Sequence, residues 1–170
     1  MKAKLIINDK ELEVDISEAE LKKLEVQPEG LKKTGYERVM PDEMYYYVDE
    51  DGNVMSSSLT WEDEDESLYL VANCYSDEIV ADNNARADRL MRQLRRFAVE
   101  HRRTELDWGY TQNKYYFYYE HTANIICVDS YKSSQDFGTI FFDTAETAEL
   151  AIGTFRDELI WYFTEYKDSL

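Results

Sequence analysis

Residues 77–103 read DEIVADNNARADRLMRQLRRFAVEHRR, and no other stretch constrains the architecture as strongly. Apolar side chains recur there every three to four positions, which is the spacing of one face of an α-helix. The members of this face are Ile79, Val80, Ala87, Leu90, Met91, Leu94, Phe97, Ala98 and His101. Ser76 stands just before the repeat and is the expected N-cap. We therefore predict one long amphipathic helix over about residues 77–103.

Charge is sharply divided between this helix and the chain before it. Residues 86–103 carry seven arginines against two acids, whereas residues 40–85 carry thirteen acids and no lysine or arginine. The thirteen acids are Asp42, Glu43, Asp49, Glu50, Asp51, all of residues 62–66, Asp77, Glu78 and Asp82. Carboxylates so close in sequence repel one another unless they are solvated or met by cations.

The arginines have three interpretations. Arg86, Arg89, Arg92, Arg96 and Arg103 fall near the side of the helix opposite its apolar face. The favoured interpretation is that they neutralise the acidic segment from within, because a guanidinium can hold a carboxylate bidentately. The second is a basic strip for a nucleic-acid strand or an acidic partner, and the third is a plain solvated helix face.

Strands are predicted on both sides of the helix. Residues 45–48 and 54–55 flank an acidic turn, which indicates a β-hairpin, and residues 62–66 read as an acidic loop. Residues 114–121, 125–129 and 137–142 follow the helix as three strands of an antiparallel meander.

The end of the chain is predicted to be helical. Thr144 caps a helix that carries Ala148, Ala151 and Ile152, Gly153 interrupts it, and residues 155–166 form a last amphipathic helix. The chain is thus predicted to be α+β: an antiparallel sheet, made of the hairpin and the meander, packs with the long helix and two C-terminal helices.

The first residues form a separate pattern. Residues 1–27 are predicted to be a small ββα element, with strands at 5–7 and 12–16 and a helix at 17–25 that starts with the capping box of Ser17 and Glu20. Residues 28–43 contain both prolines of the chain and are predicted to be a linker. Residues 44–170 are predicted to form one tyrosine-rich domain.

Composition excludes several classes of function. The net charge of −17 and the pI near 4.4 repel nucleic acids and anionic membranes and attract basic proteins. No stretch approaches the ~20 apolar residues of a membrane span. Cys74 and Cys127 stand in apolar or aromatic surroundings and are expected to be buried free thiols of a cytoplasmic protein. The only histidines, His101 and His121, lack metal-binding spacing. We therefore expect no enzyme, no cofactor and no metal.

A set of motifs lies between residue 44 and the C-terminus. They are Tyr45-Tyr46-Tyr47-Val48-Asp49, Asn73-Cys74-Tyr75, Leu94-Arg95-Arg96-Phe97-Ala98, Lys114-Tyr115-Tyr116-Phe117-Tyr118-Tyr119 and Gly138-Thr139-Ile140-Phe141-Phe142. Over about 125 residues they resemble a tyrosine-rich module of accessory proteins of bacteriophages and prophages. Residues 1–24 resemble a hairpin-helix prefix seen on some of those proteins. Some small acidic phage proteins of this size are anti-CRISPR inhibitors that block an RNA-guided nuclease, so the resemblance implies action in the cytoplasm of a bacterial host.

Charge and resemblance together predict a binding protein. We expect it to inhibit a basic, nucleic-acid-binding defence protein of the host, such as an RNA-guided nuclease, as a DNA mimic whose carboxylates replace phosphates. The expected contacts are Asp49, Asp51, Trp61, Glu62, Asp63, Glu64 and Asp65, with Trp61 as an aromatic anchor. The alternative is a non-catalytic phage scaffold or regulatory module that associates with itself or another phage protein through its aromatic sheet.

Overall fold

The computed structural model describes residues 2–7, 10–15, 17, 33–60 and 63–166. The chain forms two compact units, residues 1–34 and residues 35–170. The first unit contains β1 (Lys2–Ile7) and β2 (Lys10–Asp15), which pair antiparallel with Leu5 opposite Leu12. The predicted hairpin at the start of the chain is confirmed. The helix predicted at residues 17–25 lies, beyond its first residue, outside the described residues.

The second unit begins with a segment that the sequence suggested was linker. Val39 is buried, and the backbone of Glu43 accepts a hydrogen bond from the Leu59 amide (3.0 Å). The Ser76 amide donates to the carbonyl of Gly35 (2.8 Å). The predicted linker of residues 28–43 therefore does not extend through residues 35–43, which pack within the second unit.

The acidic hairpin is confirmed. β3 (Met44–Val48) pairs antiparallel with β4 (Val54–Ser58), and β3 also forms a two-bond bridge with the segment before the long helix, because Tyr46 and Tyr75 exchange backbone hydrogen bonds of 2.9 and 2.8 Å. A small core lies beneath this hairpin. It consists of Val39, Tyr45, Leu59 and Cys74, with Tyr47 and Leu68 packed against it.

The predicted acidic loop is wrong, because a helix stands in its place. α2 (Asp63–Leu70) starts inside the acidic run. Carboxylates in the first turn of a helix are stabilised by the amide dipoles of its N-terminus, so an acidic run can begin a helix.

The long helix is confirmed as α3 (Glu78–Glu100), with a different cap. The Asp77 carboxylate accepts a hydrogen bond from the Val80 amide (3.1 Å), whereas the Ser76 hydroxyl donates to Glu37 (2.7 Å). Ile79, expected on the apolar face, is 70% exposed. The buried face consists of Ala81, Ala85, Ala87, Leu90, Leu94, Phe97 and Ala98.

The predicted three-stranded meander is reduced to two strands. β5 (Lys114–Glu120) pairs antiparallel with β6 (Ile125–Tyr131), and the third segment contributes one bridge between Tyr115 and Phe142. Gly138 has φ of +78°, and the Thr139 amide turns back to the carbonyl of Asp136 (3.4 Å). Residues 137–141 therefore bend where the aromatic pattern suggested an extended strand.

The C-terminal helices are confirmed with shifted boundaries. α4 (Ala145–Thr154) starts at the predicted cap Thr144, whose hydroxyl accepts from the Thr147 amide (3.1 Å), and it runs through Gly153. α5 (Arg156–Trp161) follows and continues into the π-helical turn η1 (Tyr162–Tyr166).

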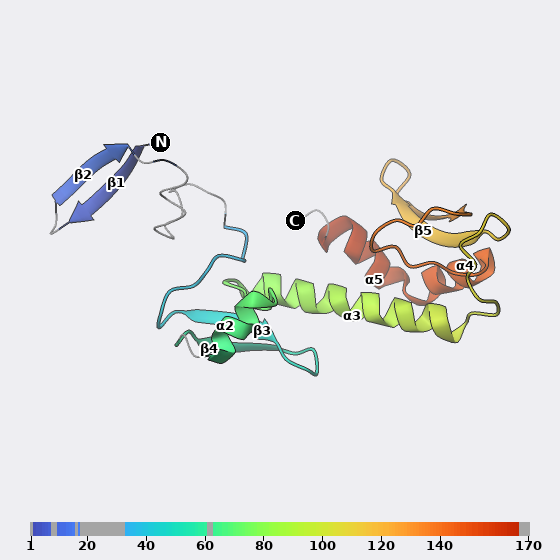
Figure 1. Ribbon diagram of the computed structural model, residues 1–170, viewed down its shortest axis with the longest axis horizontal. Helices are drawn as coiled ribbons and strands as arrows, with labels where there is room; N and C mark the ends of the chain where they lie inside the picture. The colour runs from blue at the N-terminus through green and yellow to red at the C-terminus, as the bar shows by residue number, and fades with distance from the viewer. Residues whose placement is uncertain (1, 8–9, 16, 18–32, 61–62, 167–170) are drawn as a thin grey trace. The chain divides into compact units, whose positions relative to one another are not determined.

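The second unit is α+β, as predicted, but β3–β4 and β5–β6 form two separate two-stranded sheets instead of the one sheet expected. α3 is their common support. Figure 1 shows the β3–β4 hairpin beside the N-terminal half of α3, α5 beside its middle, and α4 and the β5 hairpin toward its C-terminal end. The larger core lies at this second location. It consists of Leu90, Leu94, Phe97, Ala98, Phe142, Ala148, Ala151 and Leu159.

Candidate interaction surface

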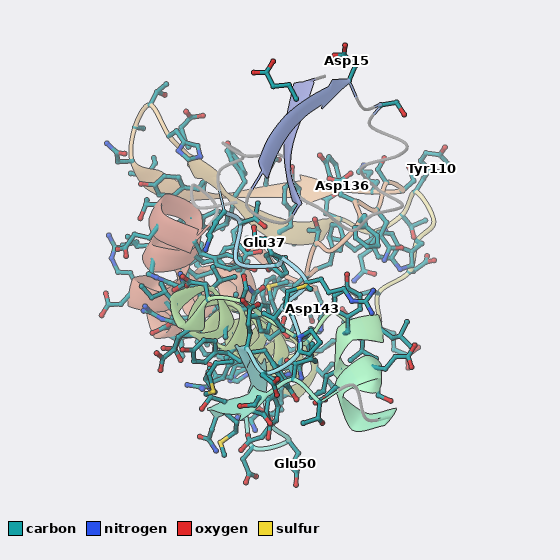
Figure 2. All side chains as sticks on the ribbon, turned by 90° about the vertical axis from the view of Figure 1, so that its left-hand side faces the viewer. Asp15, Glu37, Glu50, Tyr110, Asp136 and Asp143 are labelled. Carbon is teal, nitrogen blue, oxygen red and sulfur yellow. The ribbon has the colours of Figure 1, made fainter. Side chains whose placement is uncertain are left out.

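The tip of the β3–β4 hairpin is built around one carboxylate. Asp49 accepts hydrogen bonds from the backbone amides of Asp51 (3.0 Å) and Asn53 (2.8 Å) and from the Asn53 side-chain amide (3.2 Å). The hydrogen bond from the Asn53 backbone is the main reason why the pKa of Asp49 lies below its usual value. Asp49 therefore shapes the turn, while Glu50 and Asp51 are exposed, and Figure 2 shows Glu50 at the outer end of the hairpin.

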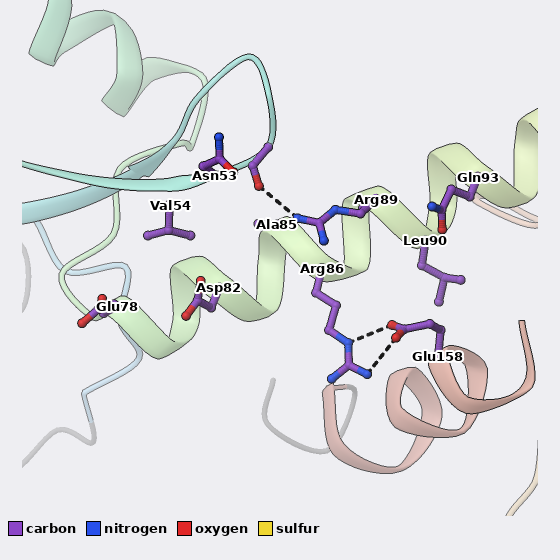
Figure 3. Close-up of a pocket in the computed structure, with 11 residues that line it drawn as sticks. Asn53, Val54, Glu78, Asp82, Ala85, Arg86, Arg89, Leu90, Gln93 and Glu158 are labelled. Carbon is purple, nitrogen blue, oxygen red and sulfur yellow. Dashed lines mark hydrogen bonds and ion pairs between the residues drawn. The ribbon is translucent and has the colours of Figure 1, made fainter.

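The tip is held against α3 by an arginine. Arg89 donates from Nη2 to the backbone carbonyl of Gly52 (3.1 Å), as Figure 3 shows. Gly52 has φ of +84°, a backbone conformation in which glycine avoids the clash of a Cβ atom. The hydrogen bond therefore fixes an exposed acidic turn to a helix.

Asp65 belongs to the interior. Its side chain is 7% exposed and accepts hydrogen bonds from the Tyr45 hydroxyl (2.6 Å), the Thr60 amide (2.8 Å) and the Thr60 hydroxyl (3.1 Å). Burial, together with this hydrogen bond to a carboxylate, raises the pKa of Tyr45 to about 12. Asp65 joins α2 to β3 and presents no charge to a partner.

The structure describes only some of the other expected contacts. Trp61 and Glu62 lie outside the described residues, while Asp63 and Glu64 form the start of α2. Glu66, next along the chain, is exposed. Within the acidic run the sequence alone did not distinguish the buried Asp65 from the exposed Glu66, because both carry the same charge and stand one position apart.

Neutralisation of the acidic segment by the α3 arginines is not observed. Within the described residues, no arginine of α3 forms an ion pair with a carboxylate of residues 40–85. Arg86 instead holds Glu158 of α5 bidentately, through Nε (2.8 Å) and Nη2 (3.0 Å), and lies over the ring of Trp161 at 3.9 Å. Arg96 contacts Glu100 on its own helix.

Most of the acids of residues 40–85 whose side chains are described consequently face solvent. The exposed ones among the described side chains are Asp42, Glu43, Glu50, Asp51, Glu66, Asp77, Glu78 and Asp82. Of these, only Asp51 was among the contacts expected from the sequence. For Glu78 and Asp82 the available signal was their position in the first turns of α3.

A cleft connects the hairpin tip with these helix acids. It has a volume of about 670 Å³ and is lined by Asn53 of the tip, by Glu78, Asp82 and Arg89 of α3, and by the Arg86–Glu158 pair (Figure 3). The hydrogen bonds from Arg86 hold the pKa of Glu158 below its ordinary value, so this pair is internally compensated. We call Glu50, Asp51, Glu78 and Asp82, at the tip and on the wall of this cleft, the acidic surface.

The outer face of the β5–β6 hairpin is aromatic. Tyr116 stacks on Tyr131 with ring centroids 4.7 Å apart and lies 6.4 Å from Tyr118, which is 40% exposed. Cys127 lies half-buried opposite Tyr118, so only Cys74 of the two free thiols is buried as expected. The inner face packs on the larger core through Tyr115 and Phe117.

Comparison of the chain with protein-family models, curated proteins and solved structures found no match. Among the described residues, no group of three or more histidine, cysteine, aspartate or glutamate side chains is placed to hold a metal ion. No helix in the described ranges has both the length and the apolar character needed to cross a membrane.

Proposed function

We propose that this protein is an acidic binding protein of a phage or mobile element that inhibits a nucleic-acid-binding defence protein of its bacterial host. It acts as a DNA mimic, in the manner of an anti-CRISPR inhibitor: its carboxylates occupy the lysines and arginines that would hold phosphates of DNA. The phage origin rests on the resemblance of the tyrosine-rich motifs. The binding mode rests on the arrangement of charge.

One observation carries this proposal. The acidic surface is exposed and, within the described residues, is not paired with the seven arginines that follow it in the sequence. If those arginines formed ion pairs with the acids, this surface would carry little net charge. Because Arg86 pairs with Glu158, most of the negative charge of residues 40–85 is available to a cationic macromolecule.

The geometry of the tip supports recognition as well as attraction. Asp49 ties the turn internally, and Arg89 fixes Gly52 to α3. Carboxylates held on a fixed turn and a helix lose less side-chain and backbone entropy on binding than those of a flexible tail. A mimic of a stiff phosphate backbone needs such fixed spacing between charges.

The experiment measures DNA binding by an RNA-guided nuclease of the bacterial host in the presence of this protein. We expect native protein to displace DNA from the nuclease, with an effect that weakens as salt is raised. The triple variant Glu50→Lys, Asp51→Lys, Asp82→Lys should weaken displacement about tenfold or more. Reversal of all of residues 62–66 is unsuitable, because Asp65 supports α2 from inside.

The matched control carries the same change in net charge elsewhere. Glu105, Asp136 and Glu149 are exposed acids outside residues 40–85, and their reversal to lysine should leave displacement nearly unchanged. An equal loss of DNA displacement in both triple variants would show a general effect of net charge. It would contradict the assignment of the binding site to the acidic surface. A nuclease unaffected by native protein at low salt would refute the proposed target.

The aromatic outer face of β5–β6 favours the alternative function. Tyr116 stacks on Tyr131 and lies beside the partly exposed Tyr118, and aromatic side chains dominate many interfaces. If the protein is instead a scaffold or regulatory module, it associates with itself or another phage protein through this face. Sedimentation would then show a homo-oligomer that persists at high salt and is weakened by Tyr118→Ser.

A further inference from the structure

A second kind of surface adjoins the acidic run at the C-terminal end of α2. Three consecutive apolar residues there reach solvent: Tyr69 is 42%, Leu70 75% and Val71 71% exposed. We call these three residues the apolar ridge. Single exposed apolar side chains are ordinary on protein surfaces, whereas a contiguous group rimmed by charge marks a candidate interaction site.

The ridge cannot turn inward, because the opposite side of α2 is already anchored. Leu68 packs against the small core beneath the hairpin, and Asp65 is held by Tyr45 and Thr60. Residues three or four apart share one helix face, so Asp65 and Leu68 define the buried side and Tyr69 lies at its edge, partly exposed. Leu70, two positions after Leu68, is consequently directed to the other side of the helix.

The end of α2 is rigid. The Asn73 amide donates to the carbonyl of Leu68 (2.9 Å) and the Ala72 amide to that of Tyr69 (3.0 Å), while Ala72 has φ of +56°. These are the 6→1 and 5→2 hydrogen bonds of a Schellman motif, which satisfy the last carbonyls of the helix.

Asn73 then connects this helix end to the sheet. Its side-chain oxygen accepts from the Val48 amide (2.9 Å) and its side-chain nitrogen donates to the Val48 carbonyl (2.8 Å). Leu70 and Val71 are therefore presented on a fixed support, so binding there loses little backbone entropy.

Charge determines which partner the ridge fits. Glu66 is exposed and stands four residues before Leu70, so the carboxylate and the leucine lie on the same face of α2. The ring of Tyr69 already contacts a cation, because the Arg38 guanidinium lies over it at 5.2 Å. An aliphatic patch beside the Glu66 carboxylate complements a segment in which aliphatic side chains stand beside lysines or arginines.

We infer that the apolar ridge is the docking site for a basic segment of the partner protein that also carries aliphatic side chains. This inference rests on the proposed function and assigns separate roles to the carboxylates and to the apolar residues. The carboxylates attract the partner over distance, and burial of Leu70 and Val71 against the partner's aliphatic groups slows its release.

The test uses the full chain and two synthetic peptides as probes. Both peptides have the same length and the same number of lysines; one carries leucines between the lysines, and the other carries serines at those positions. Binding is measured by fluorescence anisotropy at low and high ionic strength. We expect the leucine peptide to bind native protein about tenfold more tightly than the serine peptide, and both affinities to fall with salt.

The variant Leu70→Ser, Val71→Ser should reduce the affinity for the leucine peptide to that for the serine peptide. The control Val99→Ser, Leu150→Ser removes residues that are 64% and 54% exposed on other helices and should change neither affinity. Two outcomes would contradict the apolar ridge as the docking site. One is equal affinity of native protein for both peptides, and the other is tighter binding of the leucine peptide that persists in the Leu70→Ser, Val71→Ser variant. Salt-sensitive binding of the serine peptide would still uphold the acidic surface, whereas failure of both peptides to bind would refute the acidic surface and the ridge together.

Discussion

Lys114 is a fully buried charged residue of the second unit, although this chain is strongly acidic elsewhere. Its ammonium donates hydrogen bonds to the backbone carbonyls of Asp107, Gly109 (3.2 Å), Gln112 (2.8 Å) and Lys132. It also lies 5.2 Å from the centre of the Trp108 ring. A buried ammonium is costly unless its donors are satisfied, and here carbonyl groups of two loops satisfy them. One side chain thus organises the loop between α3 and β5.

Lys114→Met keeps the length and apolar stem of the side chain and removes its charge. We expect the free energy of unfolding to fall by about 2–4 kcal/mol, because the carbonyls that face the ammonium lose their donor. Urea unfolding followed by circular dichroism measures the loss. Lys132→Met, at an exposed lysine, is the control and should change stability by less than about 0.5 kcal/mol. A Lys114→Met protein as stable as this control would contradict the role given to the hydrogen bonds between the Lys114 ammonium and the backbone carbonyls.

Packing between elements depends on glycine at one point in the second unit. Gly35 has φ of +84°, and a Cβ atom there would stand 2.4 Å from Cγ2 of Val80 on α3. The backbone of Gly35 also accepts a hydrogen bond from the Ser76 amide (2.8 Å). The segment that enters the second unit can therefore lie against the first turn of α3 only without a side chain at this position.

Two glycine substitutions are expected to have opposite effects. Gly35→Ala should destabilise the protein by about 2–4 kcal/mol, since the methyl group clashes with Val80 and the backbone conformation disfavours a Cβ atom. Gly153→Ala lies inside α4 with no atom within 4 Å of the new methyl group, so it should stabilise the helix by about 0.5–1 kcal/mol. Thermal unfolding of both variants beside the parent measures the two shifts. Equal stability of Gly35→Ala and the parent would contradict the packing described.

The net charge of −17 acts on the molecule as a whole. Because most of the described acids of residues 40–85 face solvent while the arginines of α3 are engaged elsewhere or solvated, like charges remain close together. Their mutual repulsion opposes the compact state, and mobile ions reduce it.

Salt is therefore expected to stabilise the protein. Raising NaCl from about 0.01 M to about 0.15 M shortens the Debye length from about 30 Å to about 8 Å. The resulting gain of about 1 kcal/mol corresponds to a rise in Tm of about 2–4 °C. Melting curves at the two salt concentrations measure it, and the variant Glu50→Gln, Asp51→Asn, Asp82→Asn should respond less. A Tm that falls with salt would indicate that attractive ion pairs dominate after all.

The sequence by itself determined the elements whose signal is local. Runs of β-forming residues on both sides of an acidic turn specified the β3–β4 hairpin, and the three-to-four repeat specified α3, because local turn chemistry and the helical period follow from backbone geometry. Thr144 was identified correctly as a cap, and the neighbouring Asp143 instead accepts hydrogen bonds from the backbone amides of Arg103 and Thr104. Before α3 two capping residues stand side by side, and Asp77 took the role because Ser76 is engaged by Glu37.

Only the tertiary structure decided how the charges are used. Asp65 and Glu66 are equivalent in sequence, yet one is buried against Tyr45 and the other faces solvent, since the packing of Leu68 sets the rotation of α2. Arg86 finds its carboxylate 72 positions away, at Glu158, through the packing of α5 on α3. The prediction of a third strand in the meander was wrong for a similar reason. The chain bends at Gly138, so only Phe142 pairs with β5. Periodicity reports on a residue's own element, whereas burial and ion pairing depend on which distant elements meet it.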